Sequence, residues 1–396
     1  MTTNEKLIEL NKVFTPSAPI KEDGFFAGRY GQLKKIVDAI NQDGQHGILY
    51  GERGVGKTSL ANIMPKSFTN IFSVRVTCNR KDTFASLWSK ALKKVPLTTT
   101  ISGVGFKPME KHKSMYFEIT GDHGNSTLLS SEIEGLLADY PSSRFLFVFD
   151  EFDNILDNDT RESFADLIKS FSDNLTNTTI VLIGIADTID TLIGSHRSLE
   201  RCLKQVKMPR MSDDESEEII VTGMKSLDIR TSETVKKQII EFSSGFPHYV
   251  HLLCKYGSQK VIEEETQEFT EAHLIVAIER GIENTNEQLR SSYRKAVLGS
   301  VESHKWRNVL FACAQSISDD YNCFTLPEIT EQYNKIAGTK VKSNSIAYNL
   351  KQLCQEDRGN ILEKLDKGVN ARYRFANPMM RAFIKLKISH DLRRPD

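Results

Sequence analysis

The chain has 396 residues, a length that predicts two or three domains and excludes a single small module. Hydrophobic residues make up 39% and charged residues 26%, a composition typical of a folded globular protein and not of a disordered one. Lysine plus arginine and aspartate plus glutamate both number 52, so the net charge gives no general attraction to nucleic acid or to an anionic membrane. Binding of either kind would need a local patch.

The cysteine spacing and the N-terminal sequence indicate a cytoplasmic protein. The six cysteines lie far apart without a CxxC pair, which fits neither a disulfide framework nor a zinc knuckle. Residues 1–20 are polar and contain prolines, so they lack the apolar core of a signal peptide, and the longest apolar runs are much shorter than a bilayer span. We therefore expect no membrane partner.

The first chemical motif is a phosphate-binding loop at residues 51–58, which match the pattern GxxxxGK[ST] without exception. A chance match is expected in roughly one per cent of chains of this length. The runs 47–50 and 58–64 predict a strand before the loop and a helix after it. Glycines let backbone amides surround a phosphate, the lysine reaches its outer oxygens and the threonine holds Mg²⁺. The residues expected to bind nucleotide here are Gly51, Glu52, Arg53, Gly54, Val55, Gly56, Lys57, Thr58 and Ser59.

Strands alternate with helices on both sides of this loop, which predicts a largely parallel sheet in a three-layer α/β sandwich. Further strands are expected at residues 73–77, 145–149 and 180–186, and helices at 32–40, 84–92, 131–140 and 162–171. The polar segment 97–128 is long for a connection and is either an insertion hairpin or a functional loop, with weak strand character at 115–120.

An acidic pair follows the most apolar of these strands. Five consecutive apolar residues, Phe145–Phe149, are typical of a strand buried on both faces, and Asp150 and Glu151 come directly after it. Ligands bind at this edge of parallel sheets. We expect Asp150 to act on the magnesium shell and Glu151 to polarise the attacking water as general base. Asp187 ends the next strand and is expected beside them.

The core of the chain resembles a known family. Phe26-Ala-Gly-Arg29, the phosphate loop, the acidic pair and Leu199-Glu-Arg-Cys-Leu203 together resemble the AAA+ nucleotide-binding core. More narrowly, they resemble the origin-recognition-like ATPases and the related STAND signalling ATPases. The resemblance implies that Phe26 and Arg29 lie near the adenine, that Lys57 and Thr58 bind phosphate and Mg²⁺, that Asp150 is the second metal contact, and that Glu151 is the catalytic glutamate.

The resemblance also implies a sensor and an arginine finger. Asp187 would be the first sensor, although asparagine or threonine is more usual there, so it would sense the γ-phosphate through water or the metal. Arg201 is the candidate arginine finger because its Glu-Arg-Cys context is similar to the Ser-Arg-Cys of clamp-loader subunits. Arg197 is a rival, and either arginine could equally lie on a solvated helix face.

After Met211 a capping box, Ser212-Asp-Asp-Glu215, opens a stretch that reads as helices only, as in the lid of AAA+ proteins. Gly245-Phe-Pro247 is similar to the GxP motif of STAND ATPases. The resemblance implies that Pro247 and His248 contact the nucleotide, with the histidine where origin-recognition-like proteins usually have an arginine. His248 and His251 lie one helical turn apart, so a metal pair or a structural role are the alternatives.

The last hundred residues predict a winged helix. Helices are expected at 305–314, 327–336 and 344–353, followed by strands at 361–365 and 371–375. Residues 296–396 contain 16 lysines and arginines and 11 aspartates and glutamates, a modest excess of five positive charges. Lys367, Arg372 and Arg374 are the candidate DNA contacts. The alternative is an interaction or autoinhibitory domain.

Two functions follow from these features. In the first, the chain is a magnesium-dependent ATPase that acts as a switch, coupling its nucleotide state to the lid (211–295) and the winged helix (296–396) that follow the core (1–210). The resemblance implies a protein partner or effector subunit, a nucleotide-dependent homo-oligomer, and a role in bacterial defence or stress signalling. In the second, the chain is a DNA-binding AAA+ ATPase of initiator, loader or transposition-targeting type.

Overall fold

The structure is a computed structural model, and it describes residues 2–20, 27–101, 109–120, 128–175, 177–186, 192, 199, 201–297, 303–319, 321–365 and 371–393. Its residues form two compact units. The sheet unit comprises Ile20–Glu52 and Gly56–Pro209, and the helical unit comprises Met1–Pro19, Arg53–Val55 and Arg210–Asp396. Within the described residues, no helix is both long and apolar enough to cross a membrane.

The sheet unit contains a five-stranded parallel sheet in the order β2-β5-β6-β1-β7. The register pairs Thr77 with Asp150 and Gly51 with Ile185, so the carboxyl ends of four neighbouring strands meet at one edge. That edge is where open parallel sheets bind ligands. The strands are β1 (His46–Gly51), β2 (Ile71–Thr77), β5 (Arg144–Asp150), β6 (Thr178–Ile185) and β7 (Leu203–Lys207).

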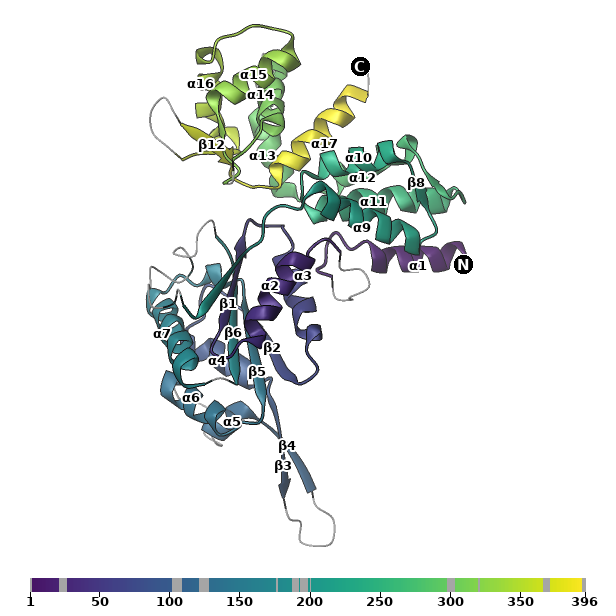
Figure 1. Ribbon diagram of the computed structural model, residues 1–396. Coiled ribbons are helices and arrows are strands. Elements are labelled where there is room, and N and C mark those ends of the chain that lie inside the picture. The colour runs from purple at the N-terminus through teal and green to yellow at the C-terminus, as the bar shows by residue number, and fades with distance from the viewer. Residues whose placement is uncertain are drawn as a thin grey trace. The chain divides into compact units, whose positions relative to one another are not determined.

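Helices cover both faces of this sheet, as the alternating sequence pattern predicts. In Figure 1, α2 and α3 lie on one side of the sheet and α4 and α7 lie on the other. This arrangement confirms the expected α/β fold with three layers. The covering helices are α2 (Tyr30–Asn41), α3 (Lys57–Ile63), α4 (Phe84–Leu92), α6 (Ser130–Ala138) and α7 (Asn158–Asn174), with a short turn η2 (Met64–Ser67) after α3.

An aromatic cluster forms the core between the sheet and α4. The fully buried Trp88 ring lies 4.9 Å from the ring of Phe147 and 5.4 Å from that of Phe149. Phe149 in turn meets Phe164 of α7 edge to face at 4.8 Å. Edge-to-face pairs add to the stabilisation from apolar burial. This packing fixes the strand that ends in the acidic pair.

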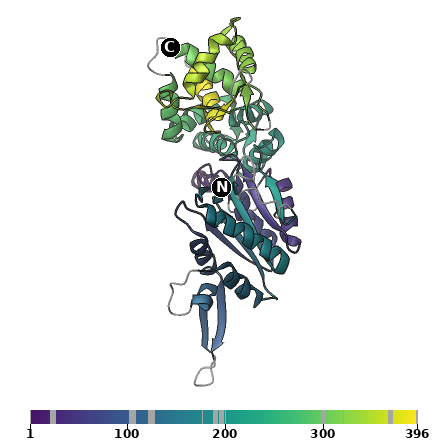
Figure 2. The ribbon, with the colours of Figure 1, turned by 90° about the vertical axis from the view of Figure 1, so that its left-hand side faces the viewer.

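The polar insertion is a hairpin followed by a helix. β3 (Pro96–Ile101) and β4 (Met109–Ser114) pair antiparallel, and Figure 2 shows this hairpin as an extension of the sheet unit beyond the five-stranded sheet. The expected strand at 115–120 is wrong, because Met115–Thr120 forms helix α5. Met115 is fully buried and its amide donates to Val95 at 3.0 Å, so tertiary packing overrides the β propensity of this segment.

The helical unit begins with α1, which the sequence analysis did not predict. The ring centroids of Phe14, just after α1, and His251 of α11 lie 5.9 Å apart. Packing against α11 therefore helps to stabilise α1, whose own sequence is mostly polar. The expected capping box is present, with the Ser212 hydroxyl accepting from the Glu215 amide. The helices are α1 (Thr3–Val13), α9 (Asp213–Ser226), α10 (Glu233–Ser243), α11 (Pro247–Glu263), α12 (Glu271–Glu283) and α13 (Glu287–Val297).

The expectation of helices only is wrong at one place in this region. The two-residue strands β8 (Arg230–Thr231) and β9 (Glu268–Phe269) pair in parallel. Each strand occupies a connection between two helices, and the Arg230 amide also donates to the Gln267 carbonyl at 2.7 Å. Runs of this length are too short to be recognised from alternation of apolar and polar residues.

The C-terminal residues form the expected three helices and hairpin. The hairpin strands belong to an antiparallel sheet in the order β10-β12-β11, and Ile346, Leu350 and Leu353 are buried as the helical periodicity predicts. The elements are α14 (Ser303–Gln315), β10 (Phe324–Thr325), α15 (Leu326–Ala337), α16 (Asn344–Leu353), β11 (Leu362–Lys364) and β12 (Arg372–Phe375). The unpredicted α17 (Met380–Arg393) follows, and Lys385 donates to the Glu241 carbonyl at the end of α10 at 3.3 Å.

Candidate nucleotide-binding site

The phosphate loop connects β1 to α3 through backbone conformations that favour glycine. Gly54 and Gly56 have φ angles of 86° and 97°, in the left-handed region where a side chain is strained. A Cβ on Gly51 would lie 2.3 Å from the Met208 carbonyl oxygen, so a close approach of two backbones requires the first glycine. α3 begins at Lys57, which leaves the first amides of this helix without partners inside the helix.

The Lys57 side chain lies over the loop. Its Nζ donates to the Gly51 carbonyl at 2.9 Å and to the Glu52 carbonyl at 2.7 Å, and the residue is 8% exposed. Burial lowers the pKa of the Lys57 ammonium to about 8, and the nearby charges of Asp153, Asp150 and Glu52 oppose that shift. A buried cation at the start of a helix attracts anions, which is the chemistry that a phosphate group needs.

Asp150 lies at the end of β5 beside the first turn of α3. Its Oδ2 accepts from the Thr58 hydroxyl at 3.2 Å, its Oδ1 accepts from the Glu151 amide at 2.9 Å, and the residue is 2% exposed. A hydroxyl and a carboxylate are both hard oxygen ligands, which Mg²⁺ prefers. The donor set therefore fits this ion, and the structure brings together the two residues that were predicted as its ligands.

Glu151 differs from Asp150 in being exposed to solvent. Its backbone has a φ of 58°, an uncommon conformation for a residue other than glycine, and its carboxylate accepts from the Asn154 side chain at 3.2 Å. The turn η4 (Phe152–Asn154) follows directly. Glu151 can therefore meet a water molecule at the edge of the sheet where Asp150 ends β5.

The sequence analysis missed three side chains at this edge, those of Arg75, Asn62 and Asp153. Arg75 of β2 forms an ion pair with Asp150 at 2.5 Å and also donates to the side chain of Asn62 in α3. Asp153 accepts from the Ile185 amide at 2.8 Å and so joins η4 to the end of β6. Alternation in β2 places Arg75 on the face opposite Val74 and Val76, but the sequence does not specify which strand lies next to it.

Two further predicted nucleotide contacts are described in the sheet unit. Arg29 is 1% exposed and donates to the Pro209 carbonyl at 2.6 Å. The Ser59 hydroxyl accepts from the Ile20 amide at 3.2 Å. Phe26 lies outside the described residues. The adenine-contact role of Arg29 stays a prediction.

The predicted arginine finger lies just before β7. Arg201 forms an ion pair with Asp173 at 2.6 Å, and 67% of its side chain is exposed. An ion pair this exposed contributes little to stability, so the side chain remains available to a partner. Asp187 and Arg197, the predicted sensor and the rival finger, lie outside the described residues.

Pro247 and His248 belong to the helical unit. Pro247 is the first residue of α11, where proline is well tolerated, and the Nδ1–H of His248 donates to the Pro16 carbonyl at 2.7 Å. Burial lowers the pKa of the His248 imidazole, and burial lowers that of His251 to about 4. The His251 ring accepts a hydrogen bond from the Thr15 amide at 3.4 Å. Among the described residues, no group of histidine, cysteine, aspartate or glutamate side chains is arranged to hold a metal ion. These contacts support the structural alternative for the two histidines.

The candidate DNA contacts on β12 are paired with acidic side chains. Arg372 lies 3.3 Å from Asp319, and the Nε of Arg374 lies 2.9 Å from Glu363. Lys367 lies outside the described residues. On α16, Tyr348 is 65% exposed. The two β12 arginines are thus partly neutralised.

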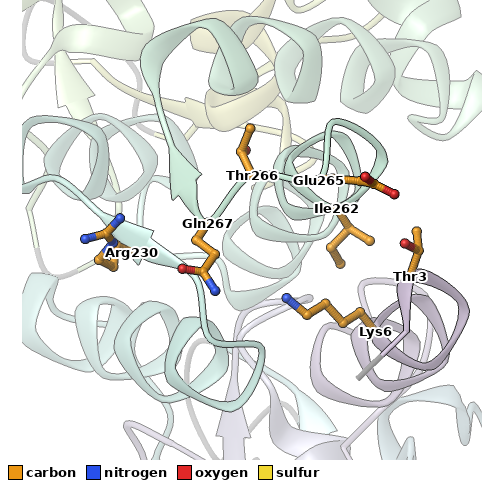
Figure 3. A pocket seen from close by; sticks show the side chains of 7 residues that line it. All are labelled: Thr3, Lys6, Arg230, Ile262, Glu265, Thr266 and Gln267. Atoms are coloured by element: carbon orange, nitrogen blue, oxygen red, sulfur yellow. The ribbon is translucent and has the colours of Figure 1, made fainter.

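A hollow of about 420 Å³ lies in the helical unit, between the start of α1, the end of α11 and the paired strands β8 and β9 (Figure 3). Lys6 and Arg230 supply its positive charge and Glu265 its negative charge. The hollow contains none of the residues predicted to bind nucleotide. Its lining residues are Thr3, Lys6, Arg230, Ile262, Glu265, Thr266 and Gln267.

The strand order, the glycine loop after β1 and the carboxylates at the end of β5 define a P-loop nucleoside triphosphatase. Residues 40–193 match the family model described as an AAA domain. The chain therefore carries an AAA-type P-loop ATPase domain. No curated protein matches the chain by sequence.

Several solved structures are similar over nearly the whole chain. A Walker-type ATPase of Pyrococcus abyssi is 16% identical, covers 94% of this chain and 99% of its own, and has a TM-score of 0.50. Cdc6p from Pyrobaculum aerophilum is 14% identical, covers 97% and 99%, and has a TM-score of 0.48. The ORC1 protein of Aeropyrum pernix, solved in complex with DNA, is 14% identical, covers 96% and 97%, and has a TM-score of 0.45. At these identities the likeness concerns the fold alone.

Proposed function

We propose that the chain binds and hydrolyses ATP with Mg²⁺ and acts as a molecular switch of the origin-recognition-like and STAND type. The observation that carries this proposal is the cluster of Lys57, Thr58 and Asp150 around a glycine loop, within a domain of the AAA class. The nucleotide state would change the arrangement of the residues after 210 and thereby the engagement of a protein partner or effector subunit. The resemblance to signalling ATPases supports a role in bacterial defence or stress signalling.

Each proposed role follows from the chemistry of one side chain. The Lys57 ammonium and the loop amides would hold the β- and γ-phosphates, and the Thr58 hydroxyl with Asp150 would hold the metal. The metal would neutralise charge on the phosphates when bound. Glu151 would accept a proton from the attacking water, for which its exposed carboxylate is suited.

DNA binding by the C-terminal residues is the second candidate function. The order of α14, α15, α16, β11 and β12 supports a winged helix, and the exposed Tyr348 of α16 favours contact with a large partner. The pairing of Arg372 with Asp319 and of Arg374 with Glu363 reduces the positive charge that DNA requires. We therefore favour a protein partner for this region. A salt-dependent shift of duplex DNA that is lost in the Arg372→Gln, Arg374→Gln double variant would reverse this preference.

Oligomerisation with ATP is part of the proposal. An arginine finger acts on the nucleotide of a neighbouring subunit when it acts in trans, and the 67% exposure of the Arg201 side chain suits that role. The molar mass in solution with and without ATP tests this point. We expect a mass increase with ATP. Assembly by the wild-type chain but not by Arg201→Ala would link this arginine to a neighbour's site.

The experiment that tests the activity is the release of phosphate from ATP by the purified chain in the presence of Mg²⁺. Asp150→Asn keeps the size of the side chain but removes the charge that would attract the metal, so we expect at least an approximately hundredfold loss of rate. Asp139→Asn, at the exposed end of α6, is the matched control and should retain wild-type turnover. An unchanged rate in Asp150→Asn would contradict the proposed site.

A further inference from the structure

The function proposed above assigns no role to the ion pair between Arg75 and Asp150. Asp150 is the carboxylate that would hold the metal, and its side chain is only 3% exposed, whereas the Arg75 side chain is 30% exposed. Arg75 comes from β2, the strand at the edge of the sheet, and lies 2.5 Å from the Oδ2 of Asp150. A buried carboxylate is costly without a positive partner, and Arg75 supplies that partner in the nucleotide-free protein.

One oxygen of the Asp150 carboxylate accepts hydrogen bonds both from Arg75 and from Thr58, which is the other predicted metal ligand. Asp150 Oδ2 accepts from Arg75 and from the Thr58 hydroxyl, while Oδ1 is used by the Glu151 amide. A divalent cation held by Thr58 and Asp150 would therefore lie close to a guanidinium group. Arginine does not lose its proton at physiological pH, so the repulsion between the two cations is not relieved by deprotonation. Close charges that are shielded from water interact strongly.

We propose that Arg75 is the resident counter-ion of Asp150 and competes with the divalent cation for this carboxylate, so that it sets the magnesium concentration at which nucleotide is bound. The inference rests on the proposed nucleotide site. Arg75 is a positioning residue, because it acts through Asp150. Its partial exposure and its place on an edge strand give the guanidinium room to leave Asp150, and the Asn62 side chain gives it a second anchor in α3.

The test is a magnesium titration of the full-length chain with a fluorescent ATP analogue at fixed concentration. Arg75→Gln keeps a polar side chain but removes the charge, so the midpoint of the titration should fall about tenfold, which is within the range usual for coupled ligands. Binding of the analogue in EDTA should change less than about threefold. Arg75→Lys keeps the charge and should leave the midpoint close to that of the wild type.

Arg144→Gln is the matched control. This arginine lies at the opposite end of the neighbouring strand β5 and donates to the Ile40 carbonyl at 2.9 Å, so its loss should not move the midpoint. An Arg75→Gln midpoint that is equal to or higher than that of the wild type would overturn the inference. If Arg75→Gln does not fold, an Arg75→Lys midpoint about tenfold away from that of the wild type would overturn the inference, because Arg75→Lys keeps the charge that is proposed to compete with the metal.

A second readout separates this inference from the proposed function. Mg²⁺ alone, without nucleotide, should raise the unfolding temperature of Arg75→Gln more than that of the wild type, because the unpaired Asp150 gains a partner. Equal shifts in the two proteins would contradict competition even if nucleotide binds as proposed. Conversely, failure of the wild type to bind the ATP analogue would contradict the proposed function, while the thermal shift by Mg²⁺ would still report on the ion pair.

Discussion

Replacing Lys57 with methionine should stabilise the nucleotide-free sheet unit while it removes nucleotide binding. The methionine keeps the long side chain but removes an ammonium that is 8% exposed. Burial lowers the pKa of this group from 10.5 to about 8, a difference of about 2.5 units. At 1.36 kcal/mol per unit, holding the charge in the folded state costs about 3 kcal/mol at pH 7.

The lost hydrogen bonds reduce this gain. Lys57 donates to the carbonyls of Gly51 and Glu52, and each such bond contributes roughly 1 kcal/mol. The expected net increase in the free energy of unfolding is therefore about 1–2 kcal/mol. For a unit of this size, the increase raises the unfolding temperature by roughly 2–8 °C.

The stability difference between Lys57→Met and the wild type should also depend on pH, in a direction that can be checked. Between about pH 8 and pH 10.5 the unfolded state retains the Lys57 proton and the folded state loses it, so the contribution of Lys57 to the wild-type free energy of unfolding becomes more favourable as the pH rises. Methionine does not titrate, so the advantage of the variant should shrink as the pH rises from 7 to 10.

The assay is differential scanning calorimetry without nucleotide at pH 7 and pH 10. Lys90→Met serves as the control, because Lys90 is 41% exposed and pairs with Asp82 at 2.6 Å, so its loss should not stabilise the fold. A Lys57→Met variant that unfolds at a lower temperature than the wild type at pH 7, or a gap that is independent of pH, would refute the reasoning.

Three further predictions concern catalysis, proton exchange and packing. Glu151→Gln should bind ATP as the wild type does but hydrolyse it at least about hundredfold more slowly, and undiminished phosphate release would remove Glu151 from its role. Near pH 8, nucleotide binding should take up roughly half a proton because a phosphate favours the charged form of Lys57, so the binding heat should depend on the ionisation enthalpy of the buffer. Trp88→Ala should lower the free energy of unfolding by about 3–5 kcal/mol in urea titrations, since the ring is fully buried against Phe147 and Phe149; a loss below 1 kcal/mol would contradict that packing.

The sheet unit could be predicted from the sequence largely because its signals are local. The apolar run before Asp150, the glycine spacing before Lys57 and the periodicity of Phe84–Leu92 each specify an element without reference to the rest of the chain. The predicted bounds of that helix agree with α4. Parallel pairing then brings the carboxyl ends of β1 and β5 to the same edge of the sheet, with β6 between them, and Asp150 lies beside Thr58 at the start of α3.

The rest depends on contacts between distant residues. α1 is polar and packs against α11 more than 200 residues away, and Met115–Thr120 has a strand-like composition but is a helix in its tertiary environment. Arg75 could be placed on one face of a strand but not beside Asp150, because strand order is not encoded in any local pattern. The residues that were missed at the site are therefore those whose role arises only from the order of the strands.

The most direct test of the account is calorimetric titration of ATP with Mg²⁺ into the wild type and into the folded Lys57→Met variant at pH 7. We expect one binding site per wild-type chain and no binding heat with the variant. Absence of binding by the wild type to either ATP or GTP, or equal affinity in the variant, would contradict the assignment of the loop around Lys57 as the nucleotide site.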